Sequence, residues 1–133
     1  MQEEGNGRKI LVVDDKPEMI LLVQKVLKPR GYEVIGAGNG EEAIRITEIE
    51  LPDLILMDVR LPGGIDGLEA TRRIKAMPLL AHIPILAVTA GVRPEDKQQA
   101  LDAGCSGFIS KPLDINELPK QVAIHIARAS STG

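Results

Sequence analysis

Short apolar runs alternate with amphipathic segments along the 133-residue chain. The runs with the length and β-branched content of strands cover residues 9–13, 32–37, 53–57, 84–89 and 107–110. The segments with the apolar spacing of helices lie near residues 17–28, 40–50, 66–76, 94–103 and 115–128. This alternation predicts a parallel sheet covered by helices on both faces. Strands that are apolar throughout agree with it, because such strands are buried on both sides.

Two residues could cap the last helix, which contains Pro119 near its start. A start after Asn116 places the proline in the first turn, where its missing N–H costs little. A cap at Asp114 would instead cost a backbone hydrogen bond at the proline. We therefore predict that this helix begins after Asn116.

Acidic residues stand at the carboxyl ends of the first and third predicted strands. Asp14 and Asp15 follow the first strand, and Asp58 ends the most apolar run of the chain. Ligands of an open parallel sheet bind beyond these strand ends, so neighbouring strands would bring the carboxylates together. Two carboxylates about 4 Å apart repel by roughly 4 kcal/mol at an effective dielectric of about 20. A raised pKa or a bound cation would compensate, and oxygen ligands alone favour Mg²⁺.

A bound cation would also make Asp58 a candidate nucleophile. A carboxylate can attack phosphorus and form an aspartyl phosphate, while a metal neutralises charge on the incoming phosphoryl group. Thr89 ends the fourth predicted strand and Lys111 follows the fifth, and both carry groups that suit phosphoryl oxygens. Each residue alone is more often a turn former or a cap. Signals at four different strand ends together indicate phosphoryl transfer.

These motifs resemble the receiver domain of bacterial two-component response regulators, including the small chemotaxis regulator. The resemblance rests on ILVVDD (10–15), PDLILMDVRLPGGIDGLE (52–69), PILAVTA (84–90) and GFISKP (107–112). It implies an α/β, flavodoxin-like fold: a doubly wound five-stranded parallel sheet, strand order 2-1-3-4-5, with five helices. It also implies one receiver domain over residues 8–128, with flexible tails at 1–7 and 129–133.

The resemblance implies a role for each matching residue of the site. Asp58 would be the phosphoacceptor, Asp15 would bind Mg²⁺ directly, and Asp14 would act on the ion through water. Arg60 would supply its backbone carbonyl to the metal, and Lys111 would pair with the phosphoryl group. The donor would be a phosphohistidine on a sensor histidine kinase or a histidine phosphotransfer protein. The domain would catalyse only its own phosphorylation and its own slow dephosphorylation.

A switch is implied in the same way. Thr89 would move toward a phosphoryl oxygen on activation, Ala90 would leave room for that group, and Phe108 would turn inward as Thr89 moves. Phe108 lacks the hydroxyl of the tyrosine that many relatives carry, so its movement would change packing only. An unknown downstream protein would read the result.

The loop after Asp58 departs from the family pattern. The family usually places an Asp-Gly pair seven and eight residues beyond the acceptor, whereas Asp66 and Gly67 lie eight and nine residues beyond it. We expect Gly63 and Gly64 to absorb the additional residue at a turn.

The helix near residues 17–28 has an apolar arc of about 160°, wider than the roughly 100° that a surface helix needs. A well-buried helix commonly has such an arc. The alternative hypothesis is that Met19, Leu22 and Val26 dock a helix of the kinase or phosphotransfer partner beside Asp58.

Composition indicates where the protein is located and which classes of partner it does not bind. No apolar run approaches the roughly 18 residues of a membrane span, and the first residues lack the apolar stretch of a secretory signal. A net charge of -3 gives no basic footprint for nucleic acid. Cys105 is the single cysteine, which is consistent with a reducing compartment. We therefore expect a cytoplasmic protein that binds neither nucleic acid nor a membrane.

Other functions remain open at this point. A phosphotransfer intermediate without its own output would carry the same motifs, and so would a receiver fragment of a larger hybrid kinase or regulator. A Mg²⁺-dependent phosphohydrolase with an aspartyl nucleophile would want a second Asp two residues after Asp58, where this chain has Arg60. A flavodoxin-like flavin binder would need aromatic residues, and the chain has only Tyr32 and Phe108.

Overall fold

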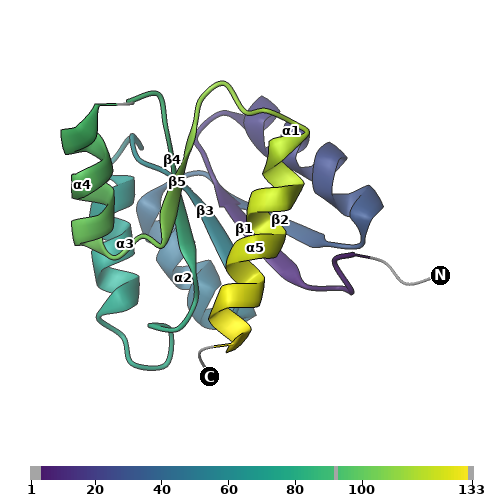
Figure 1. Ribbon diagram of the computed structural model, residues 1–133. Helices are drawn as coiled ribbons and strands as arrows, with labels where there is room; N and C mark the ends of the chain where they lie inside the picture. The colour runs from purple at the N-terminus through teal and green to yellow at the C-terminus, as the bar shows by residue number, and fades with distance from the viewer. Residues whose placement is uncertain (1–3, 92, 132–133) are drawn as a thin grey trace.

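The fold is a parallel sheet between two layers of helices (Figure 1), and the computed structural model describes residues 4–91 and 93–131. The strands are β1 (Lys9–Val13), β2 (Glu33–Ala37), β3 (Leu54–Asp58), β4 (Ile85–Thr89) and β5 (Gly107–Ser110). All neighbouring strands are parallel, in the order β2-β1-β3-β4-β5. The predicted doubly wound α/β fold and its strand order are confirmed.

The helices lie close to the predicted ranges. They are α1 (Pro17–Leu27), α2 (Gly40–Glu50), α3 (Gly67–Lys75), α4 (Pro94–Ala103) and α5 (Glu117–Ser131), and a short 3-10 helix, η1 (Lys28–Arg30), follows α1. The last helix begins at Glu117, as predicted. The side chain that accepts backbone N–H groups at this start belongs to Asp114, whose Oδ1 lies 2.8 Å from the Asn116 nitrogen and 3.2 Å from the Glu117 nitrogen.

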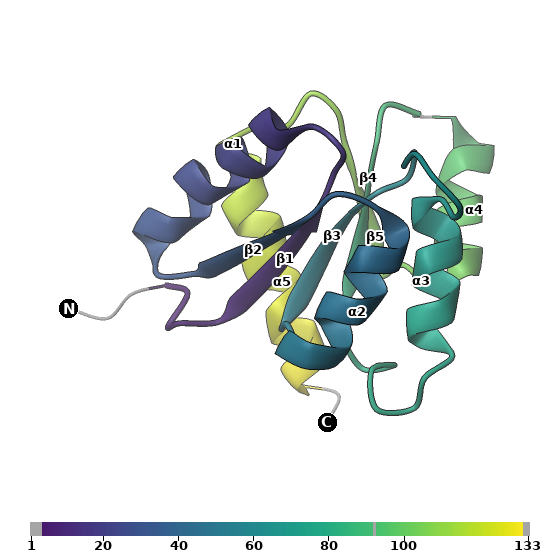
Figure 2. The same ribbon diagram turned by 180° about the vertical axis from the view of Figure 1, so that it is seen from behind.

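Each face of the sheet has its own apolar core. Leu27 of α1 and Val122 of α5 belong to one buried cluster. Ala43 of α2, Ile74 of α3 and Ala103 of α4 belong to the other. Figure 1 shows α5 in front of the sheet, and the reverse view in Figure 2 shows α2 and α3 there. Every residue of the central strand β3 is buried, which explains why its sequence is apolar up to Asp58.

The ends of the chain are only partly described. Gly5 and Gly7 donate backbone N–H groups to the carbonyls of Arg30 and Gly31, and α5 continues to Ser131. Parts of the predicted flexible tails, residues 1–3 and 132–133, lie outside the described residues. Among the helices of the described residues, none has both the length and the apolar character needed to span a membrane.

Candidate metal site at the carboxyl end of the sheet

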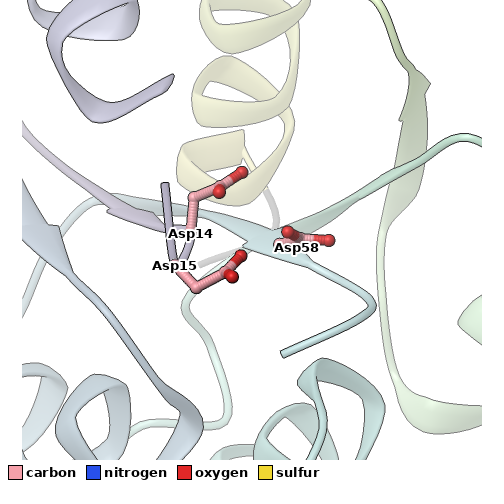
Figure 3. Close-up of side chains that lie close together, drawn as sticks. All are labelled: Asp14, Asp15 and Asp58. Atoms are coloured by element: carbon pink, nitrogen blue, oxygen red, sulfur yellow. The ribbon is translucent and has the colours of Figure 1, made fainter. Parts of the chain in front are cut away.

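The pairing of β1 with β3 brings three carboxylates together. Val13 lies opposite Met57 in the register. Asp14 and Asp58, the next residues along the chain, therefore lie at the same edge of the sheet. Asp14, Asp15 and Asp58 each offer an oxygen, and these oxygens lie within 4.8 Å of one another (Figure 3). Asp14 is 2% exposed and Asp58 is 4% exposed, whereas Asp15 is exposed. The sequence prediction of an acidic cluster therefore matches the observed geometry.

Lys111 lies between the two buried acids. Its Nζ is 3.2 Å from Oδ2 of Asp58 and 3.4 Å from Oδ2 of Asp14. The backbone N–H of Lys111 donates to the carbonyl of Thr89 at 2.8 Å, which holds the start of the β5–α5 segment against β4. The resemblance implied that Lys111 pairs with the phosphoryl group, and its contact with Asp14 appears only in the fold.

Backbone N–H groups orient both buried carboxylates. The Lys16 nitrogen is 2.9 Å from Oδ1 of Asp14, and the Arg60 nitrogen is 3.0 Å from Oδ1 of Asp58. Each contact joins an aspartate to the residue two positions later, which is the Asx-turn arrangement. Sequence analysis missed these donors, although an aspartate at a strand end is a signal for such a turn.

The electrostatics of the cluster are unbalanced. Burial raises the pKa of Asp58 above its usual value, and the hydrogen bonds from the Arg60 backbone and from Lys111 offset this only in part. Burial alone would lower the pKa of Lys111, but the hydrogen bonds and charges of Asp58 and Asp14 outweigh it, so the pKa is raised. With all groups charged, three carboxylates face one ammonium, an excess of two negative charges.

The donor set fits a magnesium ion. Mg²⁺ prefers oxygen ligands, and bonds of about 2.0–2.1 Å place its ligand oxygens roughly 3–4 Å apart. The carboxylate oxygens, all within 4.8 Å of one another, need only small rotations to reach that spacing. The charge excess also matches a divalent cation.

The raised pKa of Asp58 predicts a stability difference that depends on pH. The folded state keeps the Asp58 proton at pH values where the unfolded chain has released it, so folding stability falls as pH rises from about 4 through the raised pKa. Asp58→Asn keeps the shape of the neutral acid and removes the titration. In EDTA near neutral pH, we expect the variant to melt a few degrees above the parent protein. The difference should vanish as the pH falls below about 4, and a variant that melts lower at neutral pH would contradict this account.

The loop after β3 contains Gly63, one of the two glycines expected to absorb the additional residue. Gly63 has a φ of 93°, in the left-handed region that glycine tolerates. The loop then returns to the strand, because the Gly67 N–H donates to the Val59 carbonyl at 3.0 Å and a Cβ on Gly67 would lie 1.9 Å from the Asp58 carbonyl oxygen. Asp66 caps α3 by accepting from the Glu69 nitrogen at 2.8 Å. The shifted Asp-Gly pair therefore anchors α3 closely beneath Asp58.

The predicted switch residues lie on neighbouring strands. The Thr89 hydroxyl accepts a hydrogen bond from the Gly91 nitrogen at 2.9 Å, and Ala90 is exposed between them. Phe108 on β5 lies opposite Ala87 on β4, is half-buried, and packs against the core under α4. The Lys97 Nζ lies 4.7 Å from the centre of the Phe108 ring.

The predicted docking residues lie on α1, the helix that follows Asp14 and Asp15 in the chain. Met19 and Leu22 are half-buried, and Val26 is half-buried and packs against the core under α1. Leu21, on the other side of the helix, is 49% exposed. The structure thus leaves part of the apolar arc of α1 accessible.

Comparison with known proteins identifies the family of this site. The model of the response regulator receiver domain matches residues 10–123. The chain belongs to the response regulator receiver family. Receiver domains act as phosphoacceptors in signalling rather than as enzymes that turn over a substrate, and the predicted resemblance is confirmed.

Relatives of this receiver domain occur alone and within longer proteins. The chain is 38% identical to the alkaline phosphatase synthesis transcriptional regulatory protein PhoP of Bacillus subtilis, over 92% of this chain and 50% of PhoP. It is 34% identical to the polar-differentiation response regulator DivK of Brucella anthropi, over 92% of this chain and 98% of DivK. The receiver domain thus spans about half the length of one relative and nearly all of the other.

Solved structures of receiver domains match the whole fold. The chemotaxis response regulator CheY4 of Vibrio cholerae superimposes with a TM-score of 0.83 at 30% identity, covering 92% of this chain and 98% of CheY4. The receiver domain of the sensor histidine kinase PA1611 from Pseudomonas aeruginosa gives a TM-score of 0.83 at 36% identity, covering 91% and 98%. That structure contains a magnesium ion coordinated in its active site cleft.

Proposed function

We propose that this receiver domain accepts a phosphoryl group on Asp58 from a phosphohistidine donor, in the presence of Mg²⁺. The observation that carries the proposal is the convergence of Asp58, Lys111 and the pair of acids from β1 at one end of the sheet. This arrangement combines a buried carboxylate nucleophile, a cation for phosphoryl oxygens and the ligands for a metal.

The acidic cluster would hold the metal. Asp15 and Asp58 would bind Mg²⁺ directly, Asp14 would act through water, and the Arg60 carbonyl would complete the protein ligands. When bound, Mg²⁺ supplies charge neutralisation for the phosphoryl group. The proposed metal site is supported by the oxygen-only donor set and the excess of negative charge in this cluster.

The residues of the chain position the reaction. An Asp58 oxygen attacks phosphorus, so that a P–O bond forms while the P–N bond of the donor phosphohistidine breaks and its electron pair stays on the imidazole. The Arg60 backbone N–H orients the carboxylate through its 3.0 Å contact with Oδ1. Lys111, now 3.2 Å from Asp58, would turn to the phosphoryl oxygens. The same residues would support the slow loss of the phosphoryl group to water.

The phosphoryl group would then change the β4–β5 edge. Thr89 would exchange its hydrogen bond from Gly91 for one to a phosphoryl oxygen, with Ala90 leaving room for that group. Movement of Thr89 would allow Phe108 to turn inward beside the small Ala87. Because the Phe108 ring also contacts Lys97, this movement would alter the surface that a partner reads.

The phosphoryl donor would be a sensor histidine kinase or a histidine phosphotransfer protein, in the cytoplasm. Residues 8–128 would form the receiver unit. DivK, PhoP and PA1611 show that such domains occur as nearly whole proteins, in transcriptional regulators and in sensor kinases. A free-standing regulator, a phosphotransfer intermediate and a fragment of a larger protein all agree with the site.

The proposed function has a direct test. The protein is incubated with Mg²⁺ and acetyl phosphate, and intact-mass measurement follows the product because the chain has no Trp for fluorescence. One added phosphoryl group, dependent on Mg²⁺, is the expected result. An unchanged mass with acetyl phosphate and with a phosphorylated histidine donor would refute the function.

A charge on the accessible part of α1 should slow phosphotransfer from a protein donor. Leu22→Glu places a carboxylate in the proposed docking surface, and we expect the rate from a cognate phosphohistidine protein to fall about tenfold or more. Phosphorylation by acetyl phosphate should not change, because a small donor needs no docking surface. Leu21→Glu, at the 49% exposed neighbour, is the matched control and should leave both rates unchanged. Equal donor kinetics in Leu22→Glu and the parent would exclude docking at this position.

A further inference from the structure

Three large apolar side chains are exposed at the amino end of the sheet, opposite the acidic cluster. Leu79 is 84% exposed, Ile49 is 69% exposed and Leu51 is 57% exposed, and these are the most exposed large apolar side chains in residues 4–91 and 93–131. Ile49 and Leu51 lie at the end of α2, and Leu79 lies in the segment between α3 and β4. Leu51 shares the wall of one hollow with the end of that segment, and Figures 1 and 2 both show α2 ending at the same end of the molecule as the segment. These three residues are called the apolar patch below.

The fold holds Leu79 in place at the surface. Lys75, in the last turn of α3, donates ammonium N–H groups to the carbonyls of Ala81, at 3.0 Å, and of Ile83. Leu80, the next residue after Leu79, is 3% exposed and belongs to the core under α3. Because the segment is anchored immediately after Leu79, the exposed side chain has a defined position on the surface.

Leu51 has a backbone conformation that leucine rarely adopts. It ends α2 with a φ of 50° and a ψ of 61°, in the left-handed region, and its N–H donates to the Thr47 carbonyl at 3.0 Å. Glycine, or sometimes asparagine, is usual at this position, because a bulky side chain is strained there. The leucine gains little burial in return, since more than half of its side chain is exposed. A surface that covers Leu51 would offset this cost, and strained residues of this kind concentrate at functional sites.

The two helices that end at the apolar patch carry opposite charges. The last turn of α2 has no basic residue, and Glu48 there is exposed, with no ion pair to any residue in 4–91 or 93–131. The last turn of α3 has Arg72 and Arg73, which share the single carboxylate of Glu69 at 3.1 Å and 3.0 Å. One negative charge of α2 and one positive charge of α3 are thus not balanced locally. Because α2 and α3 pack side by side, this surface is complementary in charge to a copy of itself.

We propose that the apolar patch and the charged ends of α2 and α3 form a contact surface for a second copy of this chain. In a two-fold arrangement, Leu79 of each copy lies against Ile49 and Leu51 of the other. The acidic end of α2 in each copy then faces the basic end of α3 in the other, so every contact occurs twice. The surface is small, so the dimer is weak. It lies at the opposite end of the sheet from Asp58 and does not depend on the proposed phosphoryl chemistry.

Sedimentation velocity measures this association directly. The protein is studied from about 10 µM to about 1 mM, because a small interface gives weak association, in EDTA and without a phosphoryl donor. We expect a reversible equilibrium between monomer and dimer, which sodium chloride weakens because salt screens the exposed ion pairs. A chain that stays monomeric over the whole range would overturn the proposal and leave the patch to a different protein. Association that salt does not weaken would overturn the two-fold arrangement.

Variants of the patch test where the contact lies. Leu51→Asn and Leu79→Ser should each raise the dissociation constant of the dimer about tenfold or more, because each removes an apolar contact that occurs twice. Leu51→Asn should melt at the temperature of the parent or above it, since asparagine tolerates a positive φ. Leu101→Ser is the matched control, because Leu101 on α4 is 51% exposed, and it should leave the dissociation constant unchanged. A dimer that persists in both patch variants, or that is lost in Leu101→Ser, would overturn the proposal.

Cross-linking tests which residues face each other across the two-fold axis. A chain with Leu51→Cys is mixed with an equal amount of a chain with Leu79→Cys under mild oxidation, and the buried Cys105 does not compete. A disulfide needs the two Cβ atoms to approach closely, so the mixed dimer should form faster than either chain links to itself. Faster linkage of each chain to itself would overturn the proposed arrangement.

Discussion

Asp58→Asn is expected to abolish phosphorylation of this receiver domain, with the rate from acetyl phosphate falling at least about a hundredfold. An amide nitrogen and oxygen cannot replace the carboxylate as nucleophile toward phosphorus. The substitution nevertheless preserves size, and its oxygen can still accept the Arg60 N–H. Intact-mass measurement after incubation with Mg²⁺ and acetyl phosphate checks the result.

The matched control for this substitution is Asp53→Asn. Asp53 lies just before the amino end of the same strand, where its carboxylate accepts the Lys9 N–H at 2.8 Å. The control removes the same charge from the other end of β3, so it should be phosphorylated normally. If Asp58→Asn still gained one phosphoryl group at the parent rate, another residue would be the acceptor and the proposed function would lose its central residue.

Removal of a carboxylate from the acidic cluster is expected to weaken Mg²⁺ binding strongly. Asp15→Asn should lower the affinity by about a hundredfold and Asp14→Asn by about tenfold, because the first is proposed to touch the ion and the second to act through water. Isothermal titration calorimetry measures the affinity directly. In the parent protein, Mg²⁺ should raise the melting temperature by mass action, and EDTA should reverse the increase.

Asp66→Asn is the control for the metal experiment. Asp66 is exposed on the loop beyond Asp58 and caps α3, a role that asparagine also fills. It therefore removes one charge close to the site without removing a proposed ligand. If Asp66→Asn and Asp15→Asn lowered Mg²⁺ affinity equally, general negative charge and not direct ligation would explain binding at this end of the sheet.

The Asp15→Asn and Asp58→Asn variants distinguish metal binding from nucleophilic attack in the acidic cluster. Asp15→Asn should weaken phosphorylation only as far as the metal is lost, so raised Mg²⁺ concentrations should restore part of the rate. Asp58→Asn should not be restored at any concentration, because the nucleophile itself is missing. A common response of both variants to added Mg²⁺ would show that Asp58 acts only as a ligand.

The sequence by itself determined the elements and the acids of the cluster. Apolar runs such as 54–57 predict buried parallel strands, because strands covered on both faces are apolar at every position. The resemblance then supplies the order of the strands, and Asp14, Asp15 and Asp58 gather where that order predicts. The positive φ of Gly63 agrees with the sequence, because a turn in a loop with one additional residue favours a glycine.

Only the tertiary structure decided which side chains from different helices and strands contact one another. Lys111 reaches Asp14 as well as Asp58, and Asp114 accepts the first N–H groups at the start of α5, although Asn116 was the predicted cap. The hollow beside His125 also has no local signal in the sequence, because it joins the α3–β4 segment, the start of β5 and the end of α5. The spacing of apolar residues indicates which positions of a helix or strand are buried. Contacts between side chains of different elements depend on how those elements pack, which is fixed only when the whole core forms.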